Sequence, residues 1–106
     1  MGMNNIFYRF QPLTKNEKYA TMPARLRMNG IRAYKANPVD FELWCLAASA
    51  VNGCGKCIDA HENVLRQKGI TEQVMIAAVP IASIVHAIGT ALDVERSFVE
   101  EPVFQA

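Results

Sequence analysis

Apolar residues recur with helical spacing over the second half of the chain, and this periodicity is the strongest constraint on its fold. Ile81, Ile84, Val85, Ile88 and Leu92 show the pattern most clearly, because positions three, four and seven apart share one face of a helix. No stretch alternates apolar and polar residues for long enough to predict a strand. The sequence therefore predicts an all-α fold.

Local signals predict where the first two of these helices begin and end. The dipeptide Asn37-Pro38 predicts a helix start, because Asn is a good N-cap and Pro is tolerated at the first helical position. The dipeptide Asn52-Gly53 predicts the end of that helix. A second helix is expected from about Cys54 to Lys68, with Gly69 ending it.

The remaining helical region is expected to contain a proline break. Thr71 is predicted to cap a third helix. Pro80 is expected either to kink that helix or to start a fourth one that continues to about Val99.

The N-terminal third differs from the rest in charge. Residues 1–37 carry seven lysines and arginines and one acidic residue, whereas residues 38–106 carry four lysines and arginines and nine acidic residues. We expect residues 1–36 to form a basic, extended or irregular arm, with a possible short helix within Met22–Ile31, that packs on the acidic remainder. Residues 37–101 are the predicted helical core, and residues 102–106 are a predicted tail.

Size and composition narrow the class of protein. The chain has 106 residues, 51% of them hydrophobic, and a formal net charge of +1. These values fit one compact domain and argue against a wholly basic nucleic-acid binder. The longest apolar stretch, Val74–Ile88, is interrupted by polar residues and a proline, and the N-terminus has no apolar signal core. We therefore expect a cytoplasmic protein with no nucleic-acid or membrane partner.

Three cysteines and one histidine carry the chemistry that the sequence suggests. An odd number of cysteines does not make a disulfide scaffold, so the pair Cys54 and Cys57 is expected to be redox-active or metal-binding. His61 lies one helical turn after Cys57, where it can accept the thiol proton. The expected helix N-terminus, together with Lys56, favours a thiolate. Two cysteines this close can also close a disulfide after one of them is oxidised.

Glu42 is the candidate partner of His61. On its predicted helix it shares a face with Cys45, Leu46 and Ser49, and a carboxylate on such a face is costly unless it has a partner. A buried histidine would be a natural partner for this carboxylate. The spacing alone does not force the two side chains together.

Other interpretations of these residues remain open. Cys54, Cys57 and His61 could bind zinc with Cys45 or Glu42, although structural zinc sites normally use two separated ligand pairs. We expect Cys45 to be a packed small hydrophobic residue instead. His86 is expected in the core or at an interface, and Trp44 and Phe41 are expected in the core rather than in contact with a substrate.

The combined pattern of Glu42 and Cys54-x-x-Cys57-x-x-x-His61 resembles the active-site signature of the alkyl hydroperoxidase D family, in the carboxymuconolactone decarboxylase-like superfamily. The flanking segments agree, and they are Asn5–Arg9, Leu26–Asn29, Asp40–Trp44, Ser49–Cys54 and Ala60–Arg66. The resemblance covers most of the chain. It suggests a short member that lacks an N-terminal helical portion, with Lys56 where some relatives carry histidine.

The resemblance implies a helical bundle with the cysteine pair at the N-terminus of a central helix, and an antioxidant alkyl hydroperoxide reductase or thiol peroxidase. It implies that Cys57 is the peroxidatic cysteine that forms a sulfenic acid. Cys54 would be the resolving cysteine that exchanges disulfides with a partner. Glu42 and His61 would form the proton relay, with His61 as the general base.

The resemblance also implies what the enzyme binds. No bound cofactor and no metal are expected. A lipoyl-type dithiol on another protein would supply electrons, a peroxiredoxin would be a partner, and the chain would form a homo-oligomer, a trimer or hexamer.

Three alternatives remain open at this point. The chain could be a disulfide-reductase adaptor that passes electrons to a peroxiredoxin and has little peroxidase activity of its own. It could be a decarboxylase-like enzyme acting on lactones, although such an enzyme needs no pair of redox thiols. It could also be a non-catalytic fragment.

Overall fold

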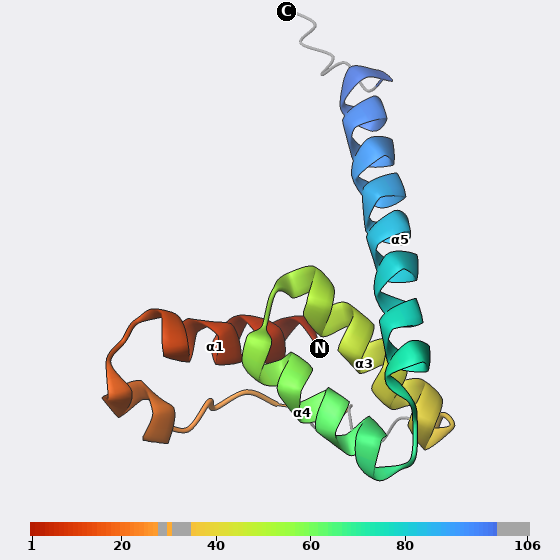
Figure 1. Ribbon diagram of the computed structural model, residues 1–106. Coiled ribbons are helices and arrows are strands. Elements are labelled where there is room, and N and C mark those ends of the chain that lie inside the picture. The colour runs from red at the N-terminus through yellow and green to blue at the C-terminus, as the bar shows by residue number, and fades with distance from the viewer. Residues whose placement is uncertain (28–29, 31–34, 100–106) are drawn as a thin grey trace, which may run out of the picture.

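The computed structural model describes residues 1–27, 30 and 35–99, and this part of the chain is helical without any strand. The predicted all-α class is confirmed. Figure 1 shows the elements in chain order, which are α1 (Gly2–Leu13), the 3₁₀ helix η1 (Glu17–Thr21), α3 (Pro38–Asn52), α4 (Gly55–Gln67) and α5 (Glu72–Val99).

The α3 and α4 helices form a packed pair whose boundaries match the sequence prediction. The Asn37 side chain accepts hydrogen bonds from the backbone N–H groups of Val39 (2.9 Å) and Asp40 (3.3 Å), which caps α3. Gly53 ends α3 in the left-handed conformation with a φ of 66°, which glycine adopts without steric cost. The chain therefore reverses within two residues, and α4 begins directly after Cys54.

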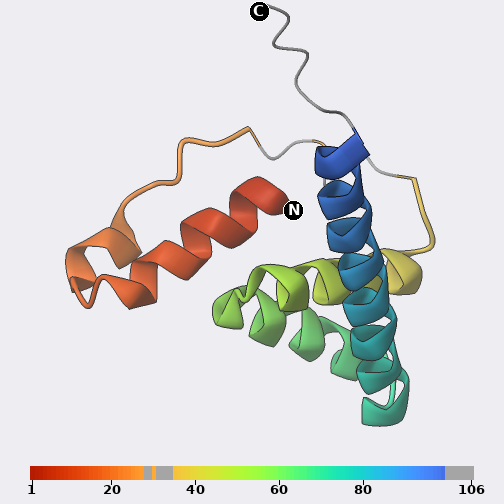
Figure 2. The same ribbon diagram turned by 90° about the horizontal axis from the view of Figure 1, so that it is seen from above.

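The prediction of an irregular start to the chain is wrong, because α1 is a regular helix of 12 residues. It lies against α3 and α4, on the side of that pair away from the outer part of α5 (Figures 1 and 2). Its two buried side chains are polar, Asn5 and Gln11, so it shows no buried apolar stripe that the sequence could reveal. Pro12 lies in the last turn, where a missing N–H group interrupts little of the helix.

The possible short helix within Met22–Ile31 does not include Met22–Arg27, which are not helical. Gly30 is helical, and positions 28–29 and 31 lie outside the described residues. The predicted tail, residues 102–106, also lies outside them.

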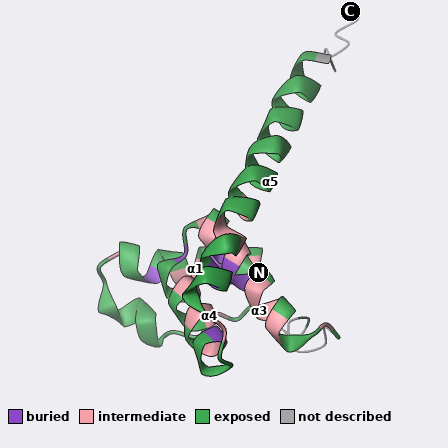
Figure 3. Ribbon diagram, turned by 45° about the vertical axis from the view of Figure 1, so that its right-hand side comes forward, coloured by how far each residue is buried: buried purple, intermediate pink, exposed green. Residues whose placement is uncertain are grey.

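Pro80 does not start a new helix, because it lies inside α5, which has 28 residues in all. The expected apolar face of this helix is present, but it is exposed rather than packed (Figure 3). Five side chains on it are each more than half exposed, and they are Ile81, Ile84, Val85, Ile88 and Leu92. The outer part of α5 extends away from the other helices (Figure 1).

The segment Glu72–Phe98 is also long and apolar enough to cross a membrane by length and composition alone. No membrane span was predicted from the sequence, because Pro80, Ser83 and His86 interrupt the apolar run of this segment. A single helix of this kind is weak evidence for a membrane protein, because core helices of soluble proteins pass the same test.

The hydrophobic core of the single chain is small. Its buried cluster consists of Leu46, Leu65 and Met75, from α3, α4 and α5. The radius of gyration is 17.5 Å, whereas a compact chain of this length has about 13 Å. Trp44 is 53% exposed, so the expectation that it is a core residue is wrong for the chain by itself. His86 is also exposed in the single chain, so of its two expected places only the interface stays a prediction.

Candidate active site

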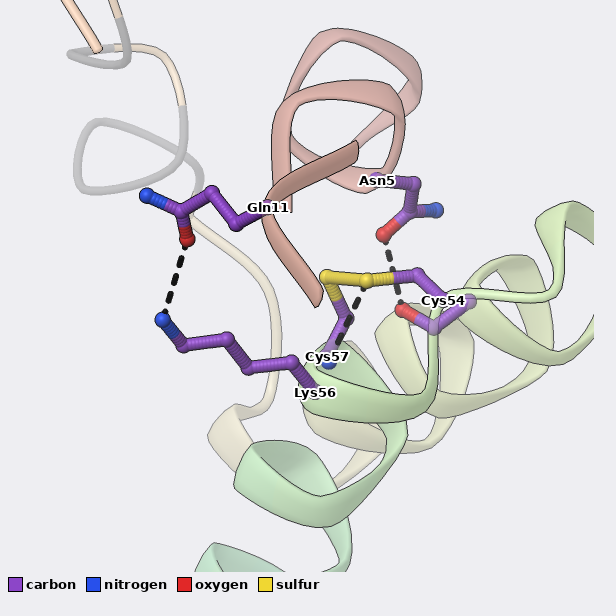
Figure 4. The surroundings of a disulfide bond; sticks show 6 residues. Asn5, Gln11, Cys54, Lys56 and Cys57 are labelled. Atoms are coloured by element: carbon purple, nitrogen blue, oxygen red, sulfur yellow. Dashed lines mark hydrogen bonds between the residues drawn. A yellow bond between two sulfur atoms is a disulfide. The ribbon is translucent and has the colours of Figure 1, made fainter. Parts of the chain in front are cut away.

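The two cysteines of the motif lie at the first turn of α4 and are joined to each other by a disulfide bond (Figure 4). Cys54 is the N-cap of the helix, and its sulfur accepts a hydrogen bond from the backbone N–H of Cys57 (3.2 Å). Their Cα atoms are 5.3 Å apart, because the first helical turn brings residues i and i+3 together. Local structure therefore places the pair for reversible oxidation.

Cys57 lines a pocket, and Cys54 does not belong to the lining of that pocket. Cys54 is 0% exposed, whereas Cys57 is 6% exposed and lines a hollow between α1 and α4. We call this hollow the thiol pocket, and its volume is about 490 Å³. Its lining residues are Met1, Asn4, Tyr8, Lys56, Cys57, Ala60 and His61. A small molecule that enters it therefore meets Cys57 before Cys54.

His61 and Glu42 are in contact. The Nδ1 atom of His61 lies 2.8 Å from Oε2 of Glu42, and both side chains are about four-fifths buried. The packing of α3 against α4 creates this contact across 19 residues of sequence. A carboxylate at Nδ1 fixes the orientation of the ring and favours a proton on that nitrogen, which leaves Nε2 as the basic atom.

His61 lines the thiol pocket together with Cys57. The spacing of four residues on α4 puts the two side chains one above the other on the same face. The structure thus brings together three of the four predicted site residues, because Glu42 contacts His61 and His61 shares the thiol pocket with Cys57. The fourth, Cys54, is the disulfide partner behind them.

A buried polar pair, Asn5 and Ser49, lies close to the disulfide and was not identified from the sequence (Figure 4). The hydroxyl of Ser49 donates a hydrogen bond to Oδ1 of Asn5 (3.1 Å), and both residues are fully buried. The Nδ2 atom of Asn5 has no hydrogen-bond partner among the described residues. The only sequence signal was the place of Ser49 on the same face as Glu42.

Lys56 is directed away from the sulfur atoms and toward α1 (Figure 4). Its Nζ atom donates to Oε1 of Gln11 (3.1 Å) and lies 5.1 Å from the centre of the Tyr8 ring. Lys56 was predicted to favour a thiolate through its positive charge, whereas its side chain contacts α1. Gln11 and Tyr8 were missed because α1 was not predicted.

The third cysteine is separate from the pair. Cys45 is buried on α3 and is a free thiol, as expected for a packed small residue. Burial, together with the nearby charge of Glu42, raises the pKa of its thiol. No group of three or more His, Cys, Asp and Glu side chains is arranged to hold a metal ion in the described part of the chain. The zinc interpretation therefore has no support from this geometry.

Comparisons with known proteins agree with the motif. The sequence model of the carboxymuconolactone decarboxylase family matches residues 17–99. The chain is 68% identical over 96 residues to a protein of Acidobacterium capsulatum named alkyl hydroperoxide reductase AhpD, covering 91% of this chain and 52% of that protein. Proteins of the same name are 61% identical over 95 residues in Solibacter usitatus (90% and 54% covered) and 57% identical over 93 residues in Brucella canis (88% and 53% covered). The chain thus spans about half the length of the curated relatives that it matches.

Proposed function

Because this chain belongs to the carboxymuconolactone decarboxylase family, and because its thiol pocket holds Cys57 one helical turn from His61, we propose that it reduces organic hydroperoxides through the Cys54–Cys57 pair. The observation that carries the proposal is the pocket, which joins a redox-active sulfur, a histidine and an open volume in one place. The printed name of the relatives, alkyl hydroperoxide reductase, supports the same chemistry.

The first step oxidises Cys57. Nε2 of His61 accepts the thiol proton, and Glu42 stabilises the resulting imidazolium through Nδ1. The thiolate attacks the terminal peroxide oxygen, which bears the hydrogen, and the O–O bond breaks. The alkoxide leaves with the proton from His61, so that one alcohol and one Cys57 sulfenic acid are formed.

The second step forms the disulfide. The thiol of Cys54 attacks the sulfenic sulfur of Cys57, and one water molecule leaves. The oxidised form described here is the product of this step. The Cα separation of 5.3 Å allows the bond without rearrangement of the α4 backbone.

The third step needs two electrons from an external dithiol, for which we propose a lipoyl-type group on another protein. Its thiolate attacks a sulfur of the disulfide and makes a mixed disulfide. The resemblance assigned this exchange to Cys54, but Cys54 is fully buried, which favours attack on Cys57 from the pocket. Cys54 then leaves as a thiolate, and the N–H of Cys57 and the positive end of α4 stabilise it. The second thiol of the dithiol attacks its own sulfur in the mixed disulfide, which releases Cys57 and closes the disulfide of the reductant.

The same exchange chemistry can serve a peroxiredoxin partner. In that role the reduced pair would pass electrons to the partner's disulfide and would react little with peroxide. The family resemblance suggests this adaptor function, and the thiol-counting experiment below separates the two. Both functions require a reducing compartment, for which we propose the cytoplasm.

We also propose that copies of the chain assemble through α5. Its exposed apolar face, defined by the five residues from Ile81 to Leu92 given above, is large for a chain with such a small core. A second copy can cover this face with an identical one. A membrane, or a further segment of a longer protein, is the alternative occupant that the assembly experiment tests.

The function is tested by counting free thiols after rapid mixing of the reduced protein with cumene hydroperoxide. Fast loss of two thiols per chain, with release of one alcohol, supports the peroxidase. Thiols that survive peroxide but oxidise quickly against a peroxiredoxin disulfide support the adaptor instead. Thiols that survive both reagents contradict both functions.

Matched cysteine variants make the test specific. Cys57→Ser is expected to abolish the reaction with peroxide. Cys54→Ser is expected to stop at a sulfenic acid that dimedone traps. Cys45→Ala serves as the control, because Cys45 lies outside the thiol pocket and is expected to leave the rate of thiol loss unchanged.

A further inference from the structure

Lys56 carries a charge that no acidic side chain balances in the described part of the chain. Its ammonium group is held by the amide of Gln11 and the ring of Tyr8, both on α1. These contacts fix the position of the cation but leave its charge uncompensated. Asp59 lies three residues later on α4, and no ion pair joins the two.

The thiol pocket around Lys56 is positive and otherwise largely apolar. None of its lining residues is acidic, and Glu42 is already bound to His61 outside the lining. The first turn of α4 adds the positive end of a helix dipole. The rest of the wall consists mainly of apolar surface, including the ring of Tyr8 and the side chain of Ala60. Its volume of about 490 Å³ is typical of a small-molecule site.

These features suit a ligand with an apolar body and an anionic end. Lys56 and Cys57 are neighbours in sequence and both line the pocket, so one small molecule can reach both. The ammonium is directed away from the disulfide (Figure 4), which separates the binding site of the anion from the reacting sulfur. The anionic end of such a molecule is a carboxylate, which accepts charge-assisted hydrogen bonds from an ammonium group.

We propose that Lys56 binds the carboxylate of acidic organic hydroperoxides, so that the pocket selects them over neutral hydroperoxides of the same shape. This inference rests on the proposed peroxidase function and names its substrate class. Lys56 also faces a second, outer hollow of about 780 Å³ that Gln11 and Asp59 line. Two acidic side chains, Asp59 and Glu17, line that hollow and offset its lysines Lys56 and Lys15, whereas no acidic residue lines the thiol pocket. The carboxylate is therefore placed on the side of Cys57.

The test uses 4-(2-hydroperoxypropan-2-yl)benzoic acid and its methyl ester, which differ in charge but present the same hydroperoxide. The readout is the second-order rate of Cys54–Cys57 disulfide formation in the reduced protein at low ionic strength. We expect the acid to react about tenfold faster than the ester, the effect of one charge-assisted hydrogen bond at a partly exposed site. Added salt is expected to reduce this ratio.

Three substitutions locate the effect. Lys56→Met is expected to bring the acid-to-ester ratio close to one, and Lys56→Arg is expected to keep it. Lys68→Met is the matched control, because this substitution removes the same charge and Lys68 lies at the opposite end of α4. A ratio near one in the unmodified protein, or an equal fall in Lys68→Met, overturns the proposal. An effect of Lys56→Met that is confined to the rate of reduction by an external dithiol also overturns the proposal.

A binding measurement separates this inference from the peroxidase function. NMR titration of the protein with 4-isopropylbenzoate and with its methyl ester needs no peroxide chemistry. Selective binding of the acid that is lost in Lys56→Met supports the carboxylate site even when the protein does not consume peroxide. Peroxide consumption without any acid preference overturns the inference and leaves the peroxidase function intact.

Discussion

The Nδ1 atom of His61 lies 2.8 Å from Oε2 of Glu42, so a carboxylate on α3 orients the histidine that shares the thiol pocket with Cys57. Both partners are largely shielded from water, which strengthens the interaction relative to a surface pair. In the proposed mechanism this contact has one specific consequence: it keeps Nε2 available to accept the proton of the Cys57 thiol.

Replacement of Glu42 or His61 is expected to change the pH dependence of the peroxide reaction. His61→Gln is expected to lower the single-turnover rate near pH 7 by about 100-fold, within the range for loss of a general base. Glu42→Gln is expected to lower it by roughly tenfold, because the neutral amide stabilises the imidazolium less well. Both variants should recover rate as pH rises through about 8.5, where an unassisted thiol ionises.

The measurement is stopped-flow thiol loss from pH 5 to 10, with Glu62→Gln as the control. Glu62 is a carboxylate on the same helix as His61, but it pairs with Arg66 and does not line the thiol pocket. A pH profile of Glu42→Gln that matches the unmodified protein would exclude the relay.

The mixed disulfide with an external thiol is expected on Cys57 rather than Cys54. Cys57 lines the thiol pocket, whereas Cys54 is fully buried behind it. In variants with one cysteine of the pair replaced, an aromatic disulfide reagent should react with Cys57 in Cys54→Ser at least tenfold faster than with Cys54 in Cys57→Ser, because access limits exchange. Mass spectrometry of the adduct identifies the site. Faster reaction at Cys54 would restore the assignment that the family resemblance implies.

Cys45 is expected to resist alkylation in the folded protein. Burial and the charge of Glu42 raise the pKa of its thiol, so at pH 8 less of it is thiolate than in the unfolded chain. The raised pKa stabilises the folded state below the pKa of the unfolded thiol, and this contribution is lost as pH rises through the folded pKa. Iodoacetamide at pH 8 should therefore leave Cys45 unmodified in the reduced native protein and modify it in urea, which mass spectrometry of the peptides measures. Fast labelling of Cys45 without denaturant would contradict its packing.

Assembly of the chain is expected to depend on the apolar face of α5. Ile84 and Ile88 lie on this face and are each more than half exposed in the single chain. The double variant Ile84→Lys, Ile88→Lys should reduce the mass of the particle to that of one chain, because two charges cannot be buried in an apolar interface. Thr90→Lys is the control, because Thr90 lies on the other side of the helix and is exposed.

Light scattering after size-exclusion chromatography measures the mass. A single-chain mass for the unmodified protein in aqueous buffer would exclude assembly through α5. Recovery of the dispersed protein only with detergent or vesicles would assign the same face of α5 to a membrane.

Local sequence determined the parts of the site that lie within one element. The caps at Asn37 and Gly53 fix the ends of α3 by backbone hydrogen bonding and by the left-handed conformation, so both could be predicted. The distance between Cys57 and His61 follows from helical geometry alone. The exposed stripe on α5 was also predicted as a helical face, but periodicity cannot distinguish a face that packs within the chain from one that remains open.

Tertiary structure decided everything that joins separate elements. Helical spacing could place Glu42 on a buried face, but only the packing of α3 on α4 brings it to His61. The wall formed by α1 escaped prediction, because this helix is anchored by the polar side chains of Asn5 and Gln11 rather than by an apolar stripe. Backbone geometry and short-range hydrogen bonds are therefore encoded locally, whereas the pocket depends on contacts between residues far apart in the sequence, which no local pattern specifies.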